Sequence, residues 1–498
     1  MAASSETSLP VELWSRIVQF LSSCDIQNLV LTCRYLHSCA SAHNWRRLTL
    51  CTSEPQQLER IQSIIRNPGL GHHVKHLRFK PRDWANGETM HTSLWVEDNP
   101  TWWGLLDSRY WFAPSKSRRH LIQSRESIEA ATKVIPHLTN LHEITVIPSF
   151  SQSRHPVSRP YCVLWASLRV ERIRRLNLQL HSVGVLQVFS KAIRESNIIF
   201  HCLDILSLDL GYRLPDYPGL ENDLRAIADC GRDNVTICGF FLPSRPGPHF
   251  SKVISALGCF PKLSQLHLKV FQSSWEPDPT RDYLIPFLIK HRSVLSRLQL
   301  SSYFFDQTFP ESIFVPHTAT SLPLSALSIT CDPIPYTRFP GPVPSIARFG
   351  DTLTTLVLDL SPSSRGWLYK ELHDLFIHLH KPSHGILLRR FMTRVLRLSP
   401  DIFDLMSDHL EKLETLELGY TKLVGANGLD DSDEDLFKHN LGTRTYTSWG
   451  LRRLHLRSMY SSLPSALLME FVADRIPSVK EFGPFDWSDI CLKIGPLY

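Results

Sequence analysis

Leu295-Ser-Arg-Leu298-Gln-Leu300 follows the pattern Leu-x-x-Leu-x-Leu, in which apolar and polar residues alternate as they do in a short, half-buried β-strand. The same pattern returns at residues 324–329 and 353–358. The fourth residues of its ten clear copies are Leu77, Ile144, Leu176, Leu206, Leu266, Leu298, Leu327, Leu356, Leu416 and Leu454. A repeat of this kind is typical of a solenoid, in which each unit packs only against its neighbours.

The steps between these fourth residues are mostly close to 30 residues or to twice that number. The doubled steps after Leu206 and Leu356 contain weaker copies at residues 234–237 and 393–398, the second with Leu396 as its fourth residue. Between the strands, apolar residues recur at helical spacing, as at residues 185–193. The repeated order of strand, loop and helix predicts an α/β solenoid with a curved parallel sheet, in which the fourth residues are buried and successive strands are neighbours.

The first 50 residues predict a compact unit of three helices. The first begins at Leu9-Pro10, with Ser8 as its cap, since proline is tolerated in the first turn of a helix. One apolar face of this helix is formed by Leu13, Ile17, Phe20 and Leu21. Asp25 can cap the second helix, and the third covers roughly residues 34–42. A unit of this size buries little apolar surface by itself, so it needs the rest of the chain or a partner.

These N-terminal residues resemble the F-box, a short helical module that docks onto the Skp-type adaptor of cullin-based ubiquitin ligases. The resemblance rests on Leu9-Pro10, on Thr-Cys-Arg at residues 32–34 and on Trp-Arg at residues 45–46. It implies that the adaptor-binding surface is formed or supported by Leu9, Pro10, Leu13, Ile17, Leu21, Leu29, Cys33 and Trp45. The alternative is an amphipathic three-helix cap on the following domain, which explains the periodicity but not the joint occurrence of these motifs.

The repeats lack a regular Asn after the strand and resemble the degenerate leucine-rich repeats found behind many F-boxes, particularly fungal ones. We therefore predict a three-helix F-box domain at residues 1–50 and a leucine-rich-repeat-like solenoid at residues 51–498. The resemblance implies a substrate-recognition adaptor of a Skp/cullin/F-box ubiquitin ligase, with no catalysis of its own. The alternative function is an F-box scaffold with a non-degradative role in a protein complex.

Two insertions interrupt the period. Residues 80–120 are rich in tryptophan, including Trp102 and Trp103, and predict either a cap over the first repeats or a direct contact with a bound target. Residues 425–447 include the run Asp-Asp-Ser-Asp-Glu-Asp and predict an exposed acidic loop, because like charges packed this densely repel each other. Ser432 within that run is a candidate phosphorylation site for an acidophilic kinase.

The polar positions of the repeats predict a sheet face that is slightly basic. Candidate target-binding residues are Arg78, Arg175, Arg297, Arg397, Arg453 and Arg457, together with Trp102 and Trp103. Arginine suits carboxylate and phosphate groups because its planar fork donates two hydrogen bonds at once. We therefore expect an unidentified protein target that is acidic or phosphorylated. The alternative is that many of these arginines are solvated surface charges.

Composition and motifs exclude several classes of function. Charged residues are 20% and hydrophobic residues 43% of the chain, which is typical of a globular protein. The net charge of +6 over 498 residues is too small to predict nucleic-acid binding, and no apolar run is long enough for a membrane span. Eleven cysteines without a Cys-x-x-Cys pair, and no basic apolar leader, favour a reduced chain in the cytoplasm or nucleus. No catalytic, metal-binding or cofactor motif is present, so we expect no cofactor and no metal.

Overall fold

The computed structural model describes residues 10–30, 42–50, 55–80, 132–147, 170–180, 183–210, 217–242, 250–270, 279–302, 323–331, 352–360, 366–380, 385–424, 434–458 and 466–483, with isolated residues at 37, 40, 130, 168 and 346. The chain divides into two compact units, Met1–Asn234 and Val235–Tyr498. We describe each unit by itself.

The first unit is built on a parallel sheet whose strands follow the order of the chain. These strands are β1 (Arg47–Leu50), β2 (His76–Phe79), β3 (Glu143–Val146), β4 (Arg175–Gln179) and β5 (Ile205–Asp209). The segments that connect them include α4 (Pro55–Arg66), α9 (Val183–Glu195) and α10 (Leu220–Asp229), and the 3₁₀ turns η1 (Pro68–His73), η4 (Ile135–His137) and η5 (Val170–Arg172). Two helices, α1 (Val11–Phe20) and α2 (Ser23–Val30), precede the sheet.

The second unit repeats the same arrangement over a longer stretch. Its parallel strands are β6 (Ile237–Leu242), β7 (Gln265–Val270), β8 (Arg297–Ser302), β9 (Ala326–Cys331), β10 (Thr355–Leu360), β11 (Arg390–Leu398), β12 (Thr415–Leu423), β13 (Arg453–Ser458) and β14 (Glu481–Gly483). Its helices are α11 (Phe250–Leu257), α12 (Pro279–Lys290), α16 (Tyr369–Leu379), α17 (Pro400–His409), α18 (Glu434–Gly442) and α19 (Ala466–Arg475).

Within each unit, the fourth residues of the repeats lie opposite one another and form a buried row, which we call the leucine ladder. In the second unit Leu266 pairs with Leu298, Leu298 with Leu327 and Leu327 with Leu356, without any shift in register. These side chains are at most 1% exposed. The predicted burial and sequential parallel pairing are therefore confirmed.

A single carbonyl group sets the register in almost every repeat. The Ser264 carbonyl accepts hydrogen bonds from the N–H groups of both Ser296 and Arg297, at 2.9 and 3.0 Å. The carbonyl two residues before the ladder residue accepts the same pair of bonds in other repeats, for example at Arg46, Lys75, His142, Arg174, Thr236, Ser296, Ser325, Thr354, Arg389, Glu414 and Arg452. Because this contact recurs just before each strand begins, a slipped register would break it.

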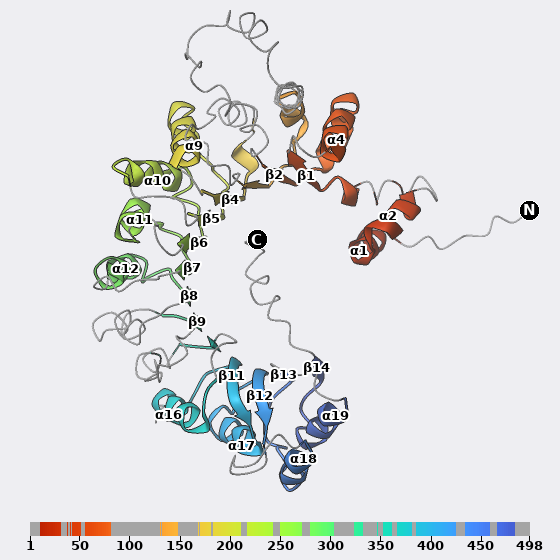
Figure 1. The fold of residues 1–498 in the computed structure, drawn as a ribbon, viewed down its shortest axis with the longest axis vertical. Coiled ribbons are helices and arrows are strands. Elements are labelled where there is room, and N and C mark those ends of the chain that lie inside the picture. The colour runs from red at the N-terminus through yellow and green to blue at the C-terminus, as the bar shows by residue number, and fades with distance from the viewer. Residues whose placement is uncertain are drawn as a thin grey trace, which may run out of the picture. The chain divides into compact units, whose positions relative to one another are not determined.

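Helices cover one face of the strands in each unit. In Figure 1, α9 and α10 lie on one side of β4 and β5, and α11 and α12 lie on one side of β6, β7 and β8. Neighbouring strands are about 4.8 Å apart, whereas packed helices need about 8–10 Å. The sheet therefore curves with its helices on the outer side, and the predicted α/β class with a curved parallel sheet is confirmed.

Three details of the predicted repeat were wrong or incomplete. The ladder residue of β11 is Phe391, which pairs with Leu356 and Leu416, and not Leu396. The pattern begins five residues earlier than predicted, with phenylalanine in place of the fourth leucine. The weak copy near residue 237 is strand β6, with Cys238 as its ladder residue. Strands β1 and β14 were missed because they are short and follow Trp45 and Val479 in place of the first leucine.

The segment predicted as an acidic loop is partly helical. Glu434 and Asp435 lie in the first turn of α18, where carboxylates stabilise the positive end of the helix dipole. Phe437 and Leu441 are fully buried at helical spacing, and Lys438 forms an ion pair with Glu434 at 2.7 Å. Glu434 and Asp435 therefore begin a packed helix. The sequence analysis relied on the density of charge and did not use the helical spacing of Phe437 and Leu441.

Replacing a ladder leucine tests the packing of the repeats. We expect Leu356→Ala to lower the free energy of unfolding by about 2–5 kcal/mol, because the side chain is fully buried and would leave a cavity. The control is Thr355→Ala, on the opposite side of the same strand, with an expected cost below about 1 kcal/mol. Denaturation in guanidinium chloride measures both. Equal costs for the two variants would contradict the ladder.

Candidate protein-binding surfaces

The N-terminal helices are held by local capping contacts. The Pro10 carbonyl accepts hydrogen bonds from the N–H groups of Leu13 and Trp14, at 3.0 and 3.2 Å, so Pro10 is the cap of α1 and not its first residue. Ser22 caps α2: its hydroxyl oxygen accepts from the Asp25 N–H at 3.2 Å, and its O–H donates to the Asp25 carboxylate at 2.6 Å. The predicted cap, Asp25, lies inside α2, since serine and aspartate three residues apart are both typical of a helix start.

Helix α1 has two apolar sides, and only one of them is buried. Val18 packs in a small core with Ile26 and Ala40, and Leu21 packs against it. Leu13, Ile17 and Phe20 are 43%, 37% and 89% exposed, and we call these three residues the α1 stripe. Their spacing of four and three residues places them along one side of the helix. Three residues of the predicted apolar face are therefore exposed, whereas the fourth, Leu21, packs against the core. The helix is anchored by Val18, which the sequence analysis did not single out.

The other predicted adaptor-binding residues are spread around the same unit. Pro10 is exposed, and Leu21 and Leu29 are half-buried. Trp45 is half-buried and lies under the guanidinium of Arg60 on α4, at 5.0 Å from the ring centre. Leu9 and Cys33 lie outside the described residues. Phe20, the most exposed large apolar residue of α1, was not among the predicted site residues, although its helical spacing from Leu13 was visible in the sequence.

Trp45 and Arg60 also connect the N-terminal helices to the first repeat. The Arg60 guanidinium donates to the carbonyl of Arg47 at 3.1 Å and to the carbonyl of Asn44. These two carbonyls lie at the end of the helical segment and the start of β1. The cation–π contact and these hydrogen bonds therefore attach α4 to the chain that leads out of the helical unit.

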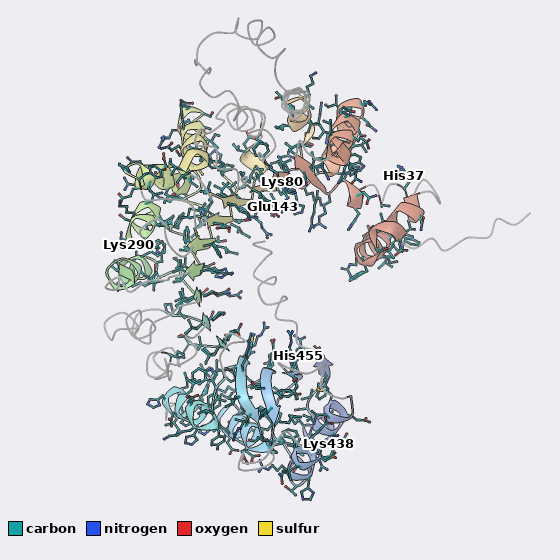
Figure 2. The ribbon with its side chains drawn as sticks, in the orientation of Figure 1. His37, Lys80, Glu143, Lys290, Lys438 and His455 are labelled. Atoms are coloured by element: carbon teal, nitrogen blue, oxygen red, sulfur yellow. The ribbon has the colours of Figure 1, made fainter. Side chains whose placement is uncertain are left out.

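The face of the sheet opposite the helices carries the polar residues of each repeat, and we call it the sheet face. In the first unit, Glu143 on β3 pairs with His76 at 2.8 Å and with Arg175 at 3.6 Å. Burial raises the pKa of Glu143, but the hydrogen bond from His76 and the positive charges of His76, Arg175 and Arg47 outweigh it and lower that pKa. The charge of Arg175, a predicted target-binding residue, is therefore partly balanced within the sheet. Figure 2 shows Glu143 among the strands of this unit.

Carboxylates also balance arginines on the sheet face of the second unit. Arg390 donates to one oxygen of the buried Glu417 from both Nε and Nη2, at 2.9 and 2.6 Å. Arg394 pairs with Asp359 at 2.8 Å. Arg453 pairs with Glu481 at 2.7 Å, and this partner was missed because β14 was missed. The sheet face is therefore less basic than the sequence indicated.

The remaining predicted arginines differ in exposure. Arg78, Arg297 and Arg397 are exposed, and Arg457 is half-buried. Arg78 on β2 and Arg297 on β8 form no ion pair with any other residue that the structure describes. Trp102, Trp103 and Ser432 lie outside the described residues. In the sequence, the predicted tryptophan-rich insertion falls between β2 and β3, which pair directly with each other.

Strands β6 to β9 form a part of the sheet face without any acidic residue. Its positions, which we call the β6–β9 face, are Ile237, Gly239, Phe241, Gln265, His267, Lys269, Arg297, Gln299, Ser301, Ala326, Ser328 and Thr330. The Lys269 ammonium lies 5.0 Å from the centre of the Phe241 ring. Burial and the neighbouring Lys269 lower the pKa of His267 to about 4, so the imidazole is neutral at pH 7.

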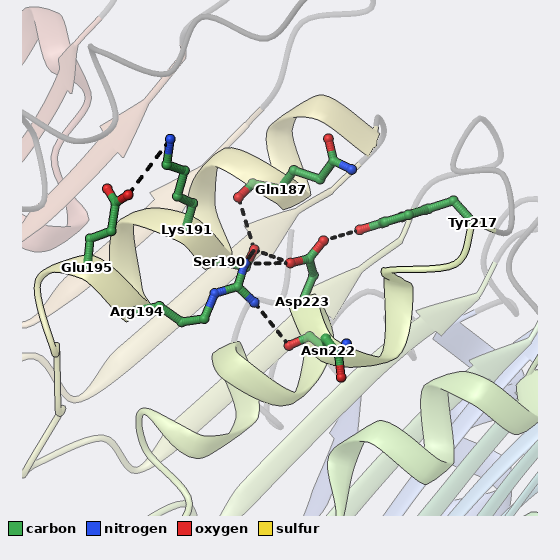
Figure 3. A network of polar contacts seen from close by, with 8 residues as sticks. All are labelled: Gln187, Ser190, Lys191, Arg194, Glu195, Tyr217, Asn222 and Asp223. Atoms are coloured by element: carbon green, nitrogen blue, oxygen red, sulfur yellow. Dashed lines mark hydrogen bonds and ion pairs between the residues drawn. The ribbon is translucent and has the colours of Figure 1, made fainter.

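Figure 3 shows a polar network on the helical side of the first unit. The buried Asp223 on α10 accepts hydrogen bonds from the hydroxyls of Ser190 and Tyr217, both at 2.5 Å, and from Arg194 at 3.0 Å. Burial and the hydrogen bond to Asp223 raise the pKa of Tyr217. Because both carboxylate oxygens are bonded to neighbouring side chains, the network joins α9 to α10 and is a structural contact.

Neither metal-binding nor membrane-spanning features occur in the part of the chain that the structure describes. No cluster of three or more His, Cys, Asp or Glu residues there could hold a metal ion. On the helical side, the ring centre of His409 lies 6.1 Å from that of His373 and 6.4 Å from that of His380. None of the described helices is both long enough and apolar enough to cross a bilayer.

Comparison with known proteins agrees with the N-terminal helical segment. Residues 7–51 match the F-box-like family. An F-box-like segment therefore precedes the repeats of this chain. No curated protein matches the chain in sequence. Among 47 solved chains that match in structure is one from the crystal structure of the Rad7 and Elc1 complex in yeast, with 12% sequence identity and a TM-score of 0.29. That match covers 78% of this chain and 94% of the other.

Arg390 and Arg389 allow an ion pair with a buried carboxylate to be compared with an exposed ion pair. We expect Arg390→Met to lower the free energy of unfolding by about 3 kcal/mol, because it leaves the charge of Glu417 buried without its partner. The control is Arg389→Met, whose ion pair with Glu414 is 69% and 42% exposed, with an expected cost below about 1 kcal/mol. Denaturant titrations compare the two. A cost for Arg390→Met no larger than that of the control would show that Glu417 does not depend on this contact.

Proposed function

We propose that this chain is a non-catalytic substrate-recognition subunit of a Skp/cullin/F-box ubiquitin ligase. The α1 stripe binds a Skp-type adaptor, and the adaptor brings the cullin. The observation that carries the proposal is the exposure of Leu13, Ile17 and Phe20 within the F-box-like segment. A soluble helix that keeps one apolar side buried and another exposed offers a binding surface for a second protein.

The side chains of the α1 stripe are large and apolar enough to anchor a partner protein. Burying a large apolar side chain contributes about 1.5–3 kcal/mol, and each 1.4 kcal/mol changes affinity about tenfold. Phe20 has the most to gain, because almost all of its side chain is exposed. Aromatic residues at the centre of an interface commonly supply a large share of its binding energy. The stripe therefore has the chemistry of an anchor, with Phe20 as its main contact.

The solenoid supplies the other half of this function. Its sheet face carries no helix in either unit among the described residues, and its polar side chains are presented in regular rows. Such a face can bind an extended partner along several repeats. Holding a target beside the ubiquitin-transfer machinery raises the effective concentration of the target lysine, so the chain contributes proximity and no bond chemistry.

A charge reversal on the α1 stripe tests the adaptor contact. We expect Ile17→Glu with Phe20→Glu to weaken binding of a purified Skp-type adaptor at least tenfold, because buried carboxylates would lose their hydration. Both residues are exposed in this structure, so the fold should be retained, which circular dichroism checks. The control is Gln62→Glu, which adds an acid at an exposed position of α4 outside the F-box-like segment. Unchanged adaptor binding by the double variant would refute the assignment of this surface.

The same variant separates degradation from a scaffold role. In cells, proteins that bind the solenoid should accumulate when the intact chain is replaced by Ile17→Glu with Phe20→Glu, because the target would no longer reach the ligase. Affinity purification with mass spectrometry identifies the bound proteins and measures their abundance. Bound proteins whose abundance stays constant, despite loss of the adaptor, would indicate a non-degradative scaffold.

A further inference from the structure

The residues two positions before the ladder form a second row, at the edge of the sheet where the strands begin. Their carbonyls accept the paired hydrogen bonds that set the register, so the residues of neighbouring repeats lie side by side. Neighbouring strands are about 4.8 Å apart, so four such residues span about 14 Å. In the repeats of β1 to β4 they are Arg46, Lys75, His142 and Arg174, which we call the basic row.

The equivalent row of the second unit shows what the fold itself requires at this position. Its first five residues are hydroxyl residues, namely Thr236, Ser264, Ser296, Ser325 and Thr354. The hydroxyls of the last four donate to the carbonyl of the preceding residue in the row, at 3.0–3.2 Å. A short hydroxyl side chain therefore completes the contact between repeats, and this contact does not require a long cationic side chain.

The charges of the basic row are not balanced by other residues that the structure describes. Arg46, Lys75 and Arg174 are exposed, and none of them forms an ion pair with another described residue. The nearby carboxylate of Glu143 is engaged by two basic residues outside the row. Like charges in opposite positions of neighbouring strands repel each other, so the row lowers stability unless an anionic partner binds it.

The cations at the far end of the second unit are arranged differently. The last four residues of that row are Arg389, Glu414, Arg452 and Lys480, so an acid stands between the cations. Arg389 pairs with Glu414 at 3.4 Å. In the first unit an acid, Asp204, follows only after the fourth basic residue.

We propose that the basic row binds the phosphate backbone of a nucleic-acid duplex. A duplex carries one negative charge per about 1.7 Å of its axis. An extended peptide with an acid at every second residue carries one per about 6.8 Å, or about two over the length of the row. The duplex therefore offers a phosphate group to each of Arg46, Lys75 and Arg174, whereas the peptide does not. This inference goes beyond the proposed role in ubiquitin transfer and does not depend on it.

The surroundings of the row favour a duplex over a single strand. Single strands are held largely by aromatic side chains on which their bases stack. Trp45, the residue before Arg46, already has the Arg60 guanidinium over its ring. Contacts to phosphate groups carry no sequence information, so we expect binding that is independent of base sequence. The net charge of the chain did not reveal this row, because its members are far apart in the sequence and meet only through the register.

Fluorescence anisotropy on the full chain provides the test. The probes are fluorescein-labelled twenty-base-pair DNA and RNA duplexes, a labelled oligo-dT of twenty nucleotides and a labelled poly-glutamate peptide of twenty residues. We expect a duplex to bind at least tenfold more tightly than oligo-dT and the peptide, and the tighter duplex identifies DNA or RNA. The logarithm of the association constant should fall with the logarithm of the salt concentration with a slope of about −3, because each neutralised phosphate contributes about −0.9.

A triple variant locates the site. Arg46→Gln with Lys75→Gln and Arg174→Gln should weaken duplex binding at least tenfold and bring the salt slope close to zero, because each of these side chains would lose one phosphate contact. All three side chains are exposed, so the fold should be retained, which circular dichroism checks.

The second unit offers a matched control at equivalent positions. Arg389→Gln with Arg452→Gln and Lys480→Gln removes the same three charges from the same place in three other repeats. It should change neither the affinity for the duplex nor the salt slope. Equal effects of the two triple variants would show attraction by overall charge and would overturn the inference.

Two further results would also overturn it. These are a salt slope that the first triple variant leaves unchanged, and tighter binding of oligo-dT or of poly-glutamate than of both duplexes. The adaptor assay is independent, since the Ile17→Glu, Phe20→Glu variant should bind the duplex like the intact chain. Absence of duplex binding with adaptor binding intact therefore contradicts this inference alone. Absence of adaptor binding with duplex binding intact contradicts the proposed function.

Discussion

The structure depends on one recurring hydrogen-bond contact. In almost every repeat, the carbonyl two residues before the ladder residue accepts from two successive N–H groups of the following repeat. This contact holds each strand in the same register as the strand before it, so a ladder residue, in most repeats a leucine, meets the ladder residue of the next repeat. The backbone bonds of the strands are satisfied within the sheet, while the ladder side chains are buried within each unit. Curvature follows, because the helices outside the sheet need more width than the strands inside it.

The same register decides the electrostatics of the exposed side of the sheet. Polar residues stand opposite each other as regularly as the leucines do, so a charge is paired or not according to its neighbour one repeat away. Glu143 meets His76 and Arg175, and Glu481 meets Arg453. Between β6 and β9 no acid occupies any of these positions, and a histidine stands opposite a glutamine. The sheet face is therefore not uniformly basic, because several arginines pair with carboxylates of neighbouring strands, whereas the β6–β9 face carries no acidic residue.

The N-terminal helices differ from the repeats, because together they are too small to bury all of their apolar residues. Val18, Ile26 and Ala40 make a minimal core, and the capping contacts of Pro10 and Ser22 define where its first two helices begin. The α1 stripe is left on the outside. Arg60 and Trp45 attach the end of this unit to the first repeat without covering the stripe. Because the helical domain is small, it leaves the α1 stripe exposed and is attached to the first repeat through Trp45 and Arg60.

The sequence by itself determined most of the strands, their order and most of the ladder, because alternation and a recurring spacing are local properties that neighbouring residues reveal. Leu298, Leu327 and Leu356 could be assigned to the core in this way. Phe391 could not, since an aromatic residue in one copy and a leucine five residues later offered two registers. Only the tertiary structure decided that α1 packs through Val18 and exposes Phe20, that Arg453 meets Glu481, and that His267 stands beside Gln299. Each of these facts depends on how segments separated along the chain align, and that alignment is set by packing and by backbone hydrogen bonds between repeats.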